Sequence, residues 1–127
     1  MTATMDTTPP APMASLWDDA HAATLSEPEL LLYRSNLLGS DMRITNFGGG
    51  NTSAKIAMTD HLTGEQVEVL WVKGCGGDLG SIKLDGFSTL YMDKLRALKG
   101  RYRGLALEDE MVAYLPHCTF NLNPRAA

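Results

Sequence analysis

Two glycine-rich stretches of this sequence, residues 46–55 and 73–81, combine residue types that could bind an anion. They read NFGGGNTSAK and KGCGGDLGS. Glycine loses more backbone entropy on ordering than any other residue, so a run of glycines is typical of backbone that approaches something closely. Successive backbone N–H groups in such loops form concave nests for anions, and we expect phosphate as the guest. Side chains that could also donate to it flank both loops: Asn51, Thr52, Ser53, Lys55, Lys73, Cys75 and Ser81.

Neither of two common nucleotide-phosphate motifs is present. A P-loop requires Gly-Lys followed by Ser or Thr, and no such tripeptide occurs. A dinucleotide fingerprint requires G-x-G-x-x-G, but Gly74-Cys75-Gly76 is followed by Leu79 at the position of the last glycine. A nucleotide motif is therefore excluded. The alternative interpretation is that the glycines form two tight turns without a ligand.

A helix is predicted before the first loop. Ser26 and Glu29 form a capping-box pattern, and apolar residues follow at helical spacing as far as Leu38. Gly39 is expected to end this helix in a left-handed conformation.

A β-hairpin is predicted between the two loops. Residues 52–58 and 67–72 have strand character, and residues 59–64 have the composition of a turn. In an antiparallel pair, the start of the first strand lies beside the end of the second. The two glycine-rich loops are therefore predicted to be neighbours.

Three further elements are predicted after the second loop. Residues 86–91 are expected to form a short strand, and residues 93–99 a helix capped by Asp93. Residues 107–115 (LEDEMVAYL) are predicted to be a helix, because its acidic residues fall in the first turn, where the helix dipole favours them. His117 and Cys118 are expected to be partly buried at a helix end.

Length and composition limit the classes of protein to which this sequence can belong. Its 127 residues suit one domain, residues 13–127, preceded by a tail at residues 1–12 whose threonines and prolines predict disorder. A net charge of -4 argues against non-specific nucleic-acid binding. Two cysteines cannot form a disulfide framework, and no apolar run is long enough to span a membrane. We therefore expect a cytoplasmic protein without nucleic-acid or membrane partners.

The motifs GGGNTSAK, WVKGCGGDLGSI and EDEMVAYLPHCTFNLNPRA resemble the class II aldolase/adducin superfamily. The resemblance is greatest to the aldolase half of bifunctional rhamnulose-1-phosphate aldolase/short-chain dehydrogenase proteins, and it covers residues 14–127. It implies a three-layer α/β/α fold with a central, mainly antiparallel sheet, of which this sequence would be the N-terminal portion. It also implies zinc-dependent cleavage of a ketose 1-phosphate to dihydroxyacetone phosphate and an aldehyde. For rhamnulose 1-phosphate, that aldehyde is lactaldehyde.

The resemblance also assigns site residues. Gly50-Asn51 match the Gly-Asn of the superfamily's first phosphate loop, and Cys75-Gly76 match the Ser/Thr-Gly of its second. At Cys75 the sequence departs from the pattern, because a thiol is a weaker hydrogen-bond donor than a hydroxyl. Lys73 and Asp78 also fit the second loop, without an assigned role. The predicted phosphate site consists of Gly50, Asn51, Thr52, Ser53, Cys75 and Gly76.

No metal site and no catalytic residue are predicted within this sequence itself. In the superfamily, the catalytic acid and the zinc-binding histidines follow the Asn-Pro-Arg that stands here just before Ala127. The histidines present are His21, His61 and His117, which fall on separate predicted elements, whereas catalytic zinc needs three converging ligands. We therefore expect this chain alone to be inactive and to bind no zinc.

The resemblance has a further implication and leaves two alternatives. Members of the superfamily form homotetramers. Because the metal and acid–base half is not expected in this chain, it is expected to need a complementary segment. The alternatives are a non-catalytic, adducin-like interaction module and a gene fragment.

Overall fold

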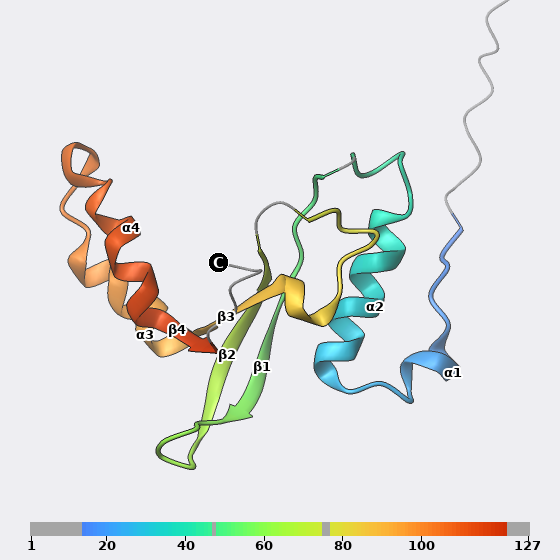
Figure 1. Cartoon of the computed structure of the whole chain (residues 1–127), viewed down its shortest axis with the longest axis horizontal. Helices are drawn as coiled ribbons and strands as arrows, with labels where there is room; N and C mark the ends of the chain where they lie inside the picture. The colour runs from blue at the N-terminus through green and yellow to red at the C-terminus, as the bar shows by residue number, and fades with distance from the viewer. Residues whose placement is uncertain (1–13, 47, 75–76, 122–127) are drawn as a thin grey trace, which may run out of the picture.

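The central element of the fold is a four-stranded antiparallel sheet with the strand order β1-β2-β3-β4 (Figure 1). The structure is a computed structural model that describes residues 14–46, 48–74 and 77–121. The strands are β1 (Ser53–Thr59), β2 (Gln66–Lys73), β3 (Phe87–Tyr91) and β4 (Thr119–Asn121). The first three confirm the predicted strands to within about one residue at most ends, whereas β4 was not predicted.

The hairpin of β1 and β2 has a regular register, in which Ser53 pairs with Val72 and Thr59 with Gln66. Gly64, at φ +72°, lies in the turn between them, as the predicted turn requires. Because Ser53 begins one strand and Val72 lies at the end of the other, both glycine-rich loops leave the hairpin at the same end.

Helix α2 (Glu27–Gly39) covers one face of the sheet, and the short helix α1 (Asp19–Ala22) precedes it. The predicted capping box is confirmed: Ser26 Oγ accepts from the Glu29 N–H, and Glu29 Oε1 accepts from the Ser26 N–H at 3.1 Å. The core cluster consists of Leu31 from α2, Ile82 and Phe87, with Leu32, Ala54 and Trp71 packed against it.

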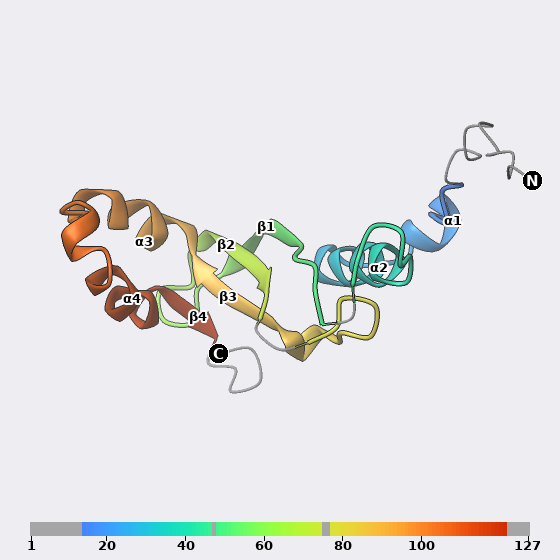
Figure 2. The same ribbon diagram turned by 90° about the horizontal axis from the view of Figure 1, so that it is seen from above.

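The opposite side of the sheet carries the C-terminal helices (Figure 2). They are α3 (Met92–Ala97) and α4 (Glu110–Tyr114), each extended or preceded by 3-10 turns: η2 (Leu98–Arg101), η3 (Leu105–Leu107) and η4 (Leu115–Cys118). Arg96 of α3 donates to Glu68, whose position in β2 alternates away from the face that carries Val69 and Trp71. The expected arrangement, in which helices cover a mainly antiparallel sheet, is confirmed.

Two details of the predicted C-terminal helices were wrong. Asp93 does not cap α3, because the N-cap residue is Tyr91 and no side chain makes a capping hydrogen bond there. The helix predicted from residue 107 begins as α4 only at Glu110, because Gly104 at φ +101° starts a separate 3-10 turn. Among the described residues, no helix is long and apolar enough to cross a membrane.

Candidate functional site

The two glycine-rich loops are in direct contact. The Lys73 N–H, at the end of β2, donates to the Thr52 carbonyl at 3.1 Å. Leu79 of the second loop lies against Gly50 of the first, where an added Cβ would come within 2.9 Å of Leu79 Cδ2. The prediction that the loops are neighbours is confirmed.

Helix α2 holds both loops through three consecutive polar residues. Arg34 Nη2 donates to the Ser53 carbonyl at 2.9 Å, and Ser35 Oγ lies 2.6 Å from Thr52 Oγ1. Asn36 Nδ2 lies within hydrogen-bond distance of the carbonyl oxygens of Leu79, Gly80 and Ile82. None of these three residues was among the predicted site residues. The available signal was a polar Arg-Ser-Asn run inside a leucine-rich helix, with Ser35 completely buried in the structure.

The C-terminal end of α2 touches the second loop through bare backbone. A Cβ at Gly39 would lie 2.1 Å from the Gly80 nitrogen, and a Cβ at Gly80 would lie 2.9 Å from the Gly39 carbonyl oxygen. The expectation of a left-handed Gly39 was wrong. Gly39 is the last residue of α2 and has no positive φ, and its lack of a side chain serves this close approach instead.

The predicted site residues differ in what they can offer a ligand. Ser35 Oγ donates its single proton to the Leu31 carbonyl at 2.6 Å, so Thr52 must be the donor in its bond with Ser35. The Thr52 hydroxyl proton is thus used within the protein. Gly50, at φ +88° and packed against Leu79, has a structural reason to be glycine.

Asn51 and Ser53 are exposed at the loop and at the start of β1. Within the described part of the chain, no residue accepts a hydrogen bond from the Asn51 side chain or from the backbone N–H groups of Gly50, Asn51 and Thr52. Cys75 and Gly76 lie outside the described residues. The described portion of the predicted site therefore presents one amide side chain, one hydroxyl and a short run of backbone donors.

The carboxylates with a strongly lowered pKa are held in local contacts. Hydrogen bonds from Arg43 lower the pKa of Asp41 to about 2. The pKa of Asp60 is also about 2, because its carboxylate accepts from the Thr63 N–H, the Tyr91 hydroxyl and the Leu62 N–H. General acid–base catalysis needs a pKa near the working pH, so neither group is suited to it.

The three histidines do not fit a zinc site. His21 packs edge-on against Tyr33, and His61 Nε2 lies 2.7 Å from Asn121 Oδ1. His117 lies beside a different set of residues, near Cys118. In the described ranges, no group of three or more His, Cys, Asp or Glu residues is placed to hold a metal ion.

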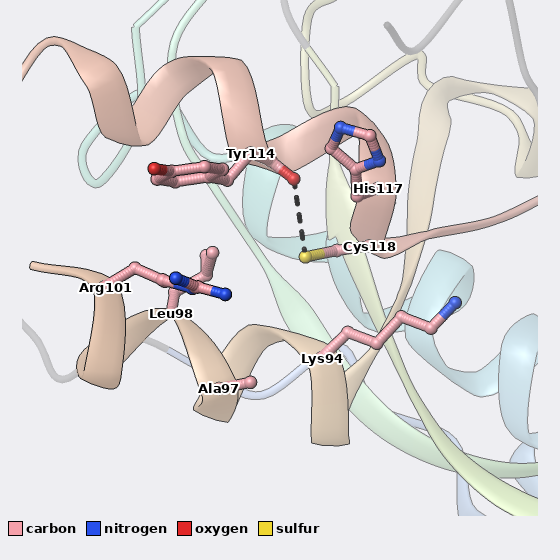
Figure 3. A pocket seen from close by; sticks show the side chains of 7 residues that line it. All are labelled: Lys94, Ala97, Leu98, Arg101, Tyr114, His117 and Cys118. Atoms are coloured by element: carbon pink, nitrogen blue, oxygen red, sulfur yellow. Dashed lines mark hydrogen bonds between the residues drawn. The ribbon is translucent and has the colours of Figure 1, made fainter.

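A separate pocket of about 410 Å³ lies between α3–η2 and α4–η4 (Figure 3). Cys118 is buried and its thiol donates to the Tyr114 carbonyl at 3.8 Å, whereas His117 is exposed, so the expectation of partial burial was wrong for His117. Arg101 lies under the Tyr114 ring, while Lys94 extends away from Arg101 (Figure 3) and stands 4.3 Å from the ring centroid of Tyr91. These basic groups do not converge, so the pocket does not form an anion site like that of the glycine loops.

Comparisons with known proteins give a sequence relative and a similar solved structure. No protein-family model matches the chain. The chain is 47% identical over 104 residues to the uncharacterized oxidoreductase YuxG of Bacillus subtilis, covering 81% of this chain and 15% of that protein. Its structure is similar to the N-terminal class II aldolase domain of a conserved protein from Thermoplasma acidophilum, with a TM-score of 0.66 and 34% identity, over 91% of this chain and 50% of that one.

The chain therefore spans only part of each of these relatives. Its mixed α/β fold with a four-stranded antiparallel sheet matches part of a class II aldolase domain. This is the fold that the sequence resemblance implied.

Proposed function

We propose that this chain supplies the phosphate-binding loops of a class II aldolase-type site. The single observation that carries the proposal is the contact between two glycine-rich loops beside an exposed Asn51. Backbone N–H groups without acceptors among the described residues stand in the same place, and such groups bind anions. The similarity to a class II aldolase domain makes a sugar phosphate the expected ligand class.

The proposed substrate of the complete protein is a ketose 1-phosphate. On the sequence resemblance, it is rhamnulose 1-phosphate, cleaved to dihydroxyacetone phosphate and lactaldehyde. A phosphate remote from the bond that breaks can be held tightly, and that binding energy orients the reacting carbons. We assign binding and orientation to Gly50, Asn51, Thr52 and Ser53, together with Cys75 and Gly76.

The described residues do not fit a zinc site, so no catalytic step is assigned to them. In the superfamily, zinc supplies Lewis-acid chemistry at the substrate carbonyl. We propose that a complementary segment, in a homotetramer of the complete protein, holds the metal and the acid–base group.

Titration of inorganic phosphate and dihydroxyacetone phosphate into the chain tests the proposal, with uncharged dihydroxyacetone as the ligand control. Asn51→Ala is expected to weaken binding by about tenfold or more, because a hydrogen bond to a charged oxygen contributes about 1.5–3 kcal/mol. Asn46→Ala makes the same chemical change in the same loop, and it leaves the bond from the Gly49 N–H to the Asn46 carbonyl intact. It should bind like the parent.

Two further substitutions bear on this test. Cys75→Ser is expected to tighten binding modestly, because it restores the better donor. Gly50→Ala is unsuitable as a probe of binding, because it would also collide with Leu79 and strain the backbone. If the folded parent shows no phosphate affinity, or if Asn51→Ala binds as well as the parent, the loops are turns and the proposal is wrong.

The alternative function is a non-catalytic interaction module, and one observation favours it. The turns and helix from η3 to η4 expose several large apolar side chains, among them Leu105 (81% exposed) and Val112 (67% exposed). A protein surface with such side chains is suited to association. Sedimentation analysis of the parent and of a Leu105→Ser, Val112→Ser variant tests this function, which requires the parent to associate and the variant to dissociate.

A further inference from the structure

The basic residues of this chain are concentrated in one segment. Residues 94–103 (KLRALKGRYR), which include most of α3 and all of η2, hold five of the eleven Lys and Arg residues and no acidic residue. The rest of the chain holds six basic residues against fifteen acidic ones. A local excess of positive charge in a protein of net charge -4 attracts negatively charged partners to that segment.

Part of this charge is neutralised within the molecule. Arg96 and Arg103 are each ion-paired with a glutamate. Lys99 and Arg101, by contrast, are exposed and form no ion pair with any residue that the structure describes. Exposed cations remain hydrated without a partner, so exposure alone assigns neither of them a role. Arg101 differs from Lys99 because it lines the pocket between the C-terminal helices.

That pocket, of about 410 Å³, combines apolar walls with a basic rim (Figure 3). Leu98 and the Tyr114 ring supply apolar surface, and the exposed side chains of Lys94, Arg101 and His117 form the rim. None of the lining residues is acidic. Because the rim groups are spread around the pocket, they suit carboxylates spaced along a peptide, with apolar side chains between the helices.

The acidic counterpart lies at the other end of the molecule. Residues 14–33 contain four acidic residues and no Lys or Arg. Figures 1 and 2 both place α1 and α3 at opposite ends of the structure. The acidic and basic regions therefore cannot meet within one molecule, but they can meet between two copies of the chain.

The segment that leads into α1 combines carboxylates with exposed apolar side chains. Leu16 is 65% and Trp17 39% exposed, and Asp18 and Asp19 follow them directly. Asp18 Oδ1 accepts from N–H groups of α1, and Asp19 Oδ1 accepts from Trp17 Nε1. The Oδ2 atoms of both carboxylates have no partner in the described part of the chain. An exposed tryptophan beside two such carboxylates has the composition of an interface anchor.

We propose that the pocket between the C-terminal helices of one copy binds residues 16–19 of a second copy. The apolar side chains of the segment lie against Leu98 and Tyr114, and its two carboxylates face the basic rim. The contact uses different surfaces on the two copies, so it is heterologous and can repeat from copy to copy. This inference goes beyond the proposed function and does not depend on the phosphate site.

Sedimentation velocity of the parent at several salt concentrations is the first test. We expect association at low ionic strength and dissociation as the salt approaches about 1 M, where the screening length falls to about 3 Å. A parent that stays monomeric at low salt and millimolar concentration would overturn the inference. An oligomer that persists at high salt would also overturn it, and would favour apolar association through Leu105 and Val112.

A pocket variant, Lys94→Gln with Arg101→Gln, removes two charges of the rim. It is expected to weaken association at low salt by about tenfold or more. The matched control, Lys55→Gln with Lys83→Gln, removes the same charge from exposed positions outside the pocket and should associate like the parent. Equal weakening in both variants would assign the effect to net charge and overturn the inference.

A segment variant, Asp18→Asn with Asp19→Asn, removes the two carboxylates. Asparagine caps a helix about as well as aspartate, so α1 should be retained. We expect the same loss of association as in the pocket variant. The matched control, Glu65→Gln with Asp78→Asn, neutralises two acidic residues elsewhere and should associate like the parent.

An equimolar mixture of the two interface variants tests the heterologous contact itself. The segment variant keeps an intact pocket and the pocket variant an intact segment, so one contact can form between them. The mixture should therefore form dimers and nothing larger, although each variant alone is monomeric. Dimers would also show that both variants are folded. A mixture that stays monomeric would overturn the inference.

Discussion

Helix α2 and the C-terminal helices lie on opposite sides of the same sheet (Figure 2), but different kinds of contact hold them. A capping box begins α2, polar side chains in its middle bond to both loops, and Gly39 at its end touches Gly80 through backbone. By contrast, α3 and α4 have no side-chain caps. The side-chain contacts of α3 and α4 include exposed ion pairs: Arg96–Glu68 joins α3 to β2, and Arg103–Glu110 lies within the C-terminal segment.

The two kinds of contact differ in how far the contacting groups can move before the contact is lost. Exposed ion pairs contribute about 0–1 kcal/mol and can form over a range of side-chain positions. Hydrogen bonds to loop carbonyls and direct backbone contacts are satisfied over a much narrower range. The fold therefore constrains the loop side of the sheet more tightly, as a preorganised binding site needs.

The largest expected effect comes from Gly39→Ala. The added Cβ would lie 2.1 Å from the Gly80 nitrogen, and backbone cannot move aside as a flexible side chain can. We expect a loss of about 3 kcal/mol or more in the free energy of unfolding, measured by urea denaturation.

Gly100→Ala is the matched control on the other side of the sheet. Gly100 lies in η2 with no atom near an added Cβ, so stability should be unchanged or higher by about 0.4–1 kcal/mol. If Gly39→Ala and Gly100→Ala lose similar amounts of unfolding free energy, the two sides of the sheet do not differ in how well they tolerate an added side chain.

The next effect in size is expected from Asn36→Ala. Its amide lies between three carbonyl oxygens of the second loop, and removing it leaves acceptors without their donor. We expect a loss of about 1–3 kcal/mol in unfolding free energy and weaker phosphate binding.

The control is Gln66→Ala. Among the described residues, the exposed Gln66 amide bonds only to Thr59 Oγ1, so this variant should change stability by about 0.5 kcal/mol or less. Normal phosphate affinity in folded Asn36→Ala would mean that α2 does not position the loop.

The contacts of the molecule also differ in whether the sequence could predict them. The capping box, the hairpin and the meeting of the loops follow from local patterns, because each depends on residues a few positions apart or on strand pairing. The contact of Gly39 with Gly80 and the bonds of Asn36 join segments more than forty residues apart, and no local pattern contains that information. The start of α4 was misjudged because the acidic residues at 108–110 suggested a dipole-stabilised first turn, whereas Leu107 belongs to the 3-10 turn that follows Gly104 and α4 begins only at Glu110.

A smaller effect should come from the Ser35–Thr52 pair, tested by a double-mutant cycle. Ser35→Ala leaves the Thr52 hydroxyl without its acceptor, and Thr52→Val removes the donor, so each is expected to cost about 1 kcal/mol of stability. Because both remove one interaction, the double variant should lose less than the sum, with a coupling of about 0.5–1.5 kcal/mol. Thr52→Val should keep phosphate affinity, because the hydroxyl proton of Thr52 is used within the protein and the group that we assign to phosphate binding at this position is the backbone N–H, which valine keeps. A large loss of affinity in Thr52→Val would mean that Thr52 leaves Ser35 to donate to the ligand.

The smallest effect is expected at the far end of the hairpin, where Asp60 accepts from the N–H groups of Leu62 and Thr63 and from the Tyr91 hydroxyl. These bonds lower its pKa from the ordinary 3.8 to about 2 in the folded protein. A carboxyl whose pKa is lower in the folded state stabilises that state above its ordinary pKa, and this contribution is lost as the pH falls toward the folded pKa.

The variant Asp60→Asn keeps an acceptor for the turn and removes the charge. We expect the parent to melt above this variant at pH 7, and the difference to shrink as the pH falls from about 4 to about 2. A pH-independent difference would assign the effect to turn geometry instead of charge. Phosphate affinity at pH 7 should be the same in both proteins, because this turn lies at the opposite end of the strands from the loops.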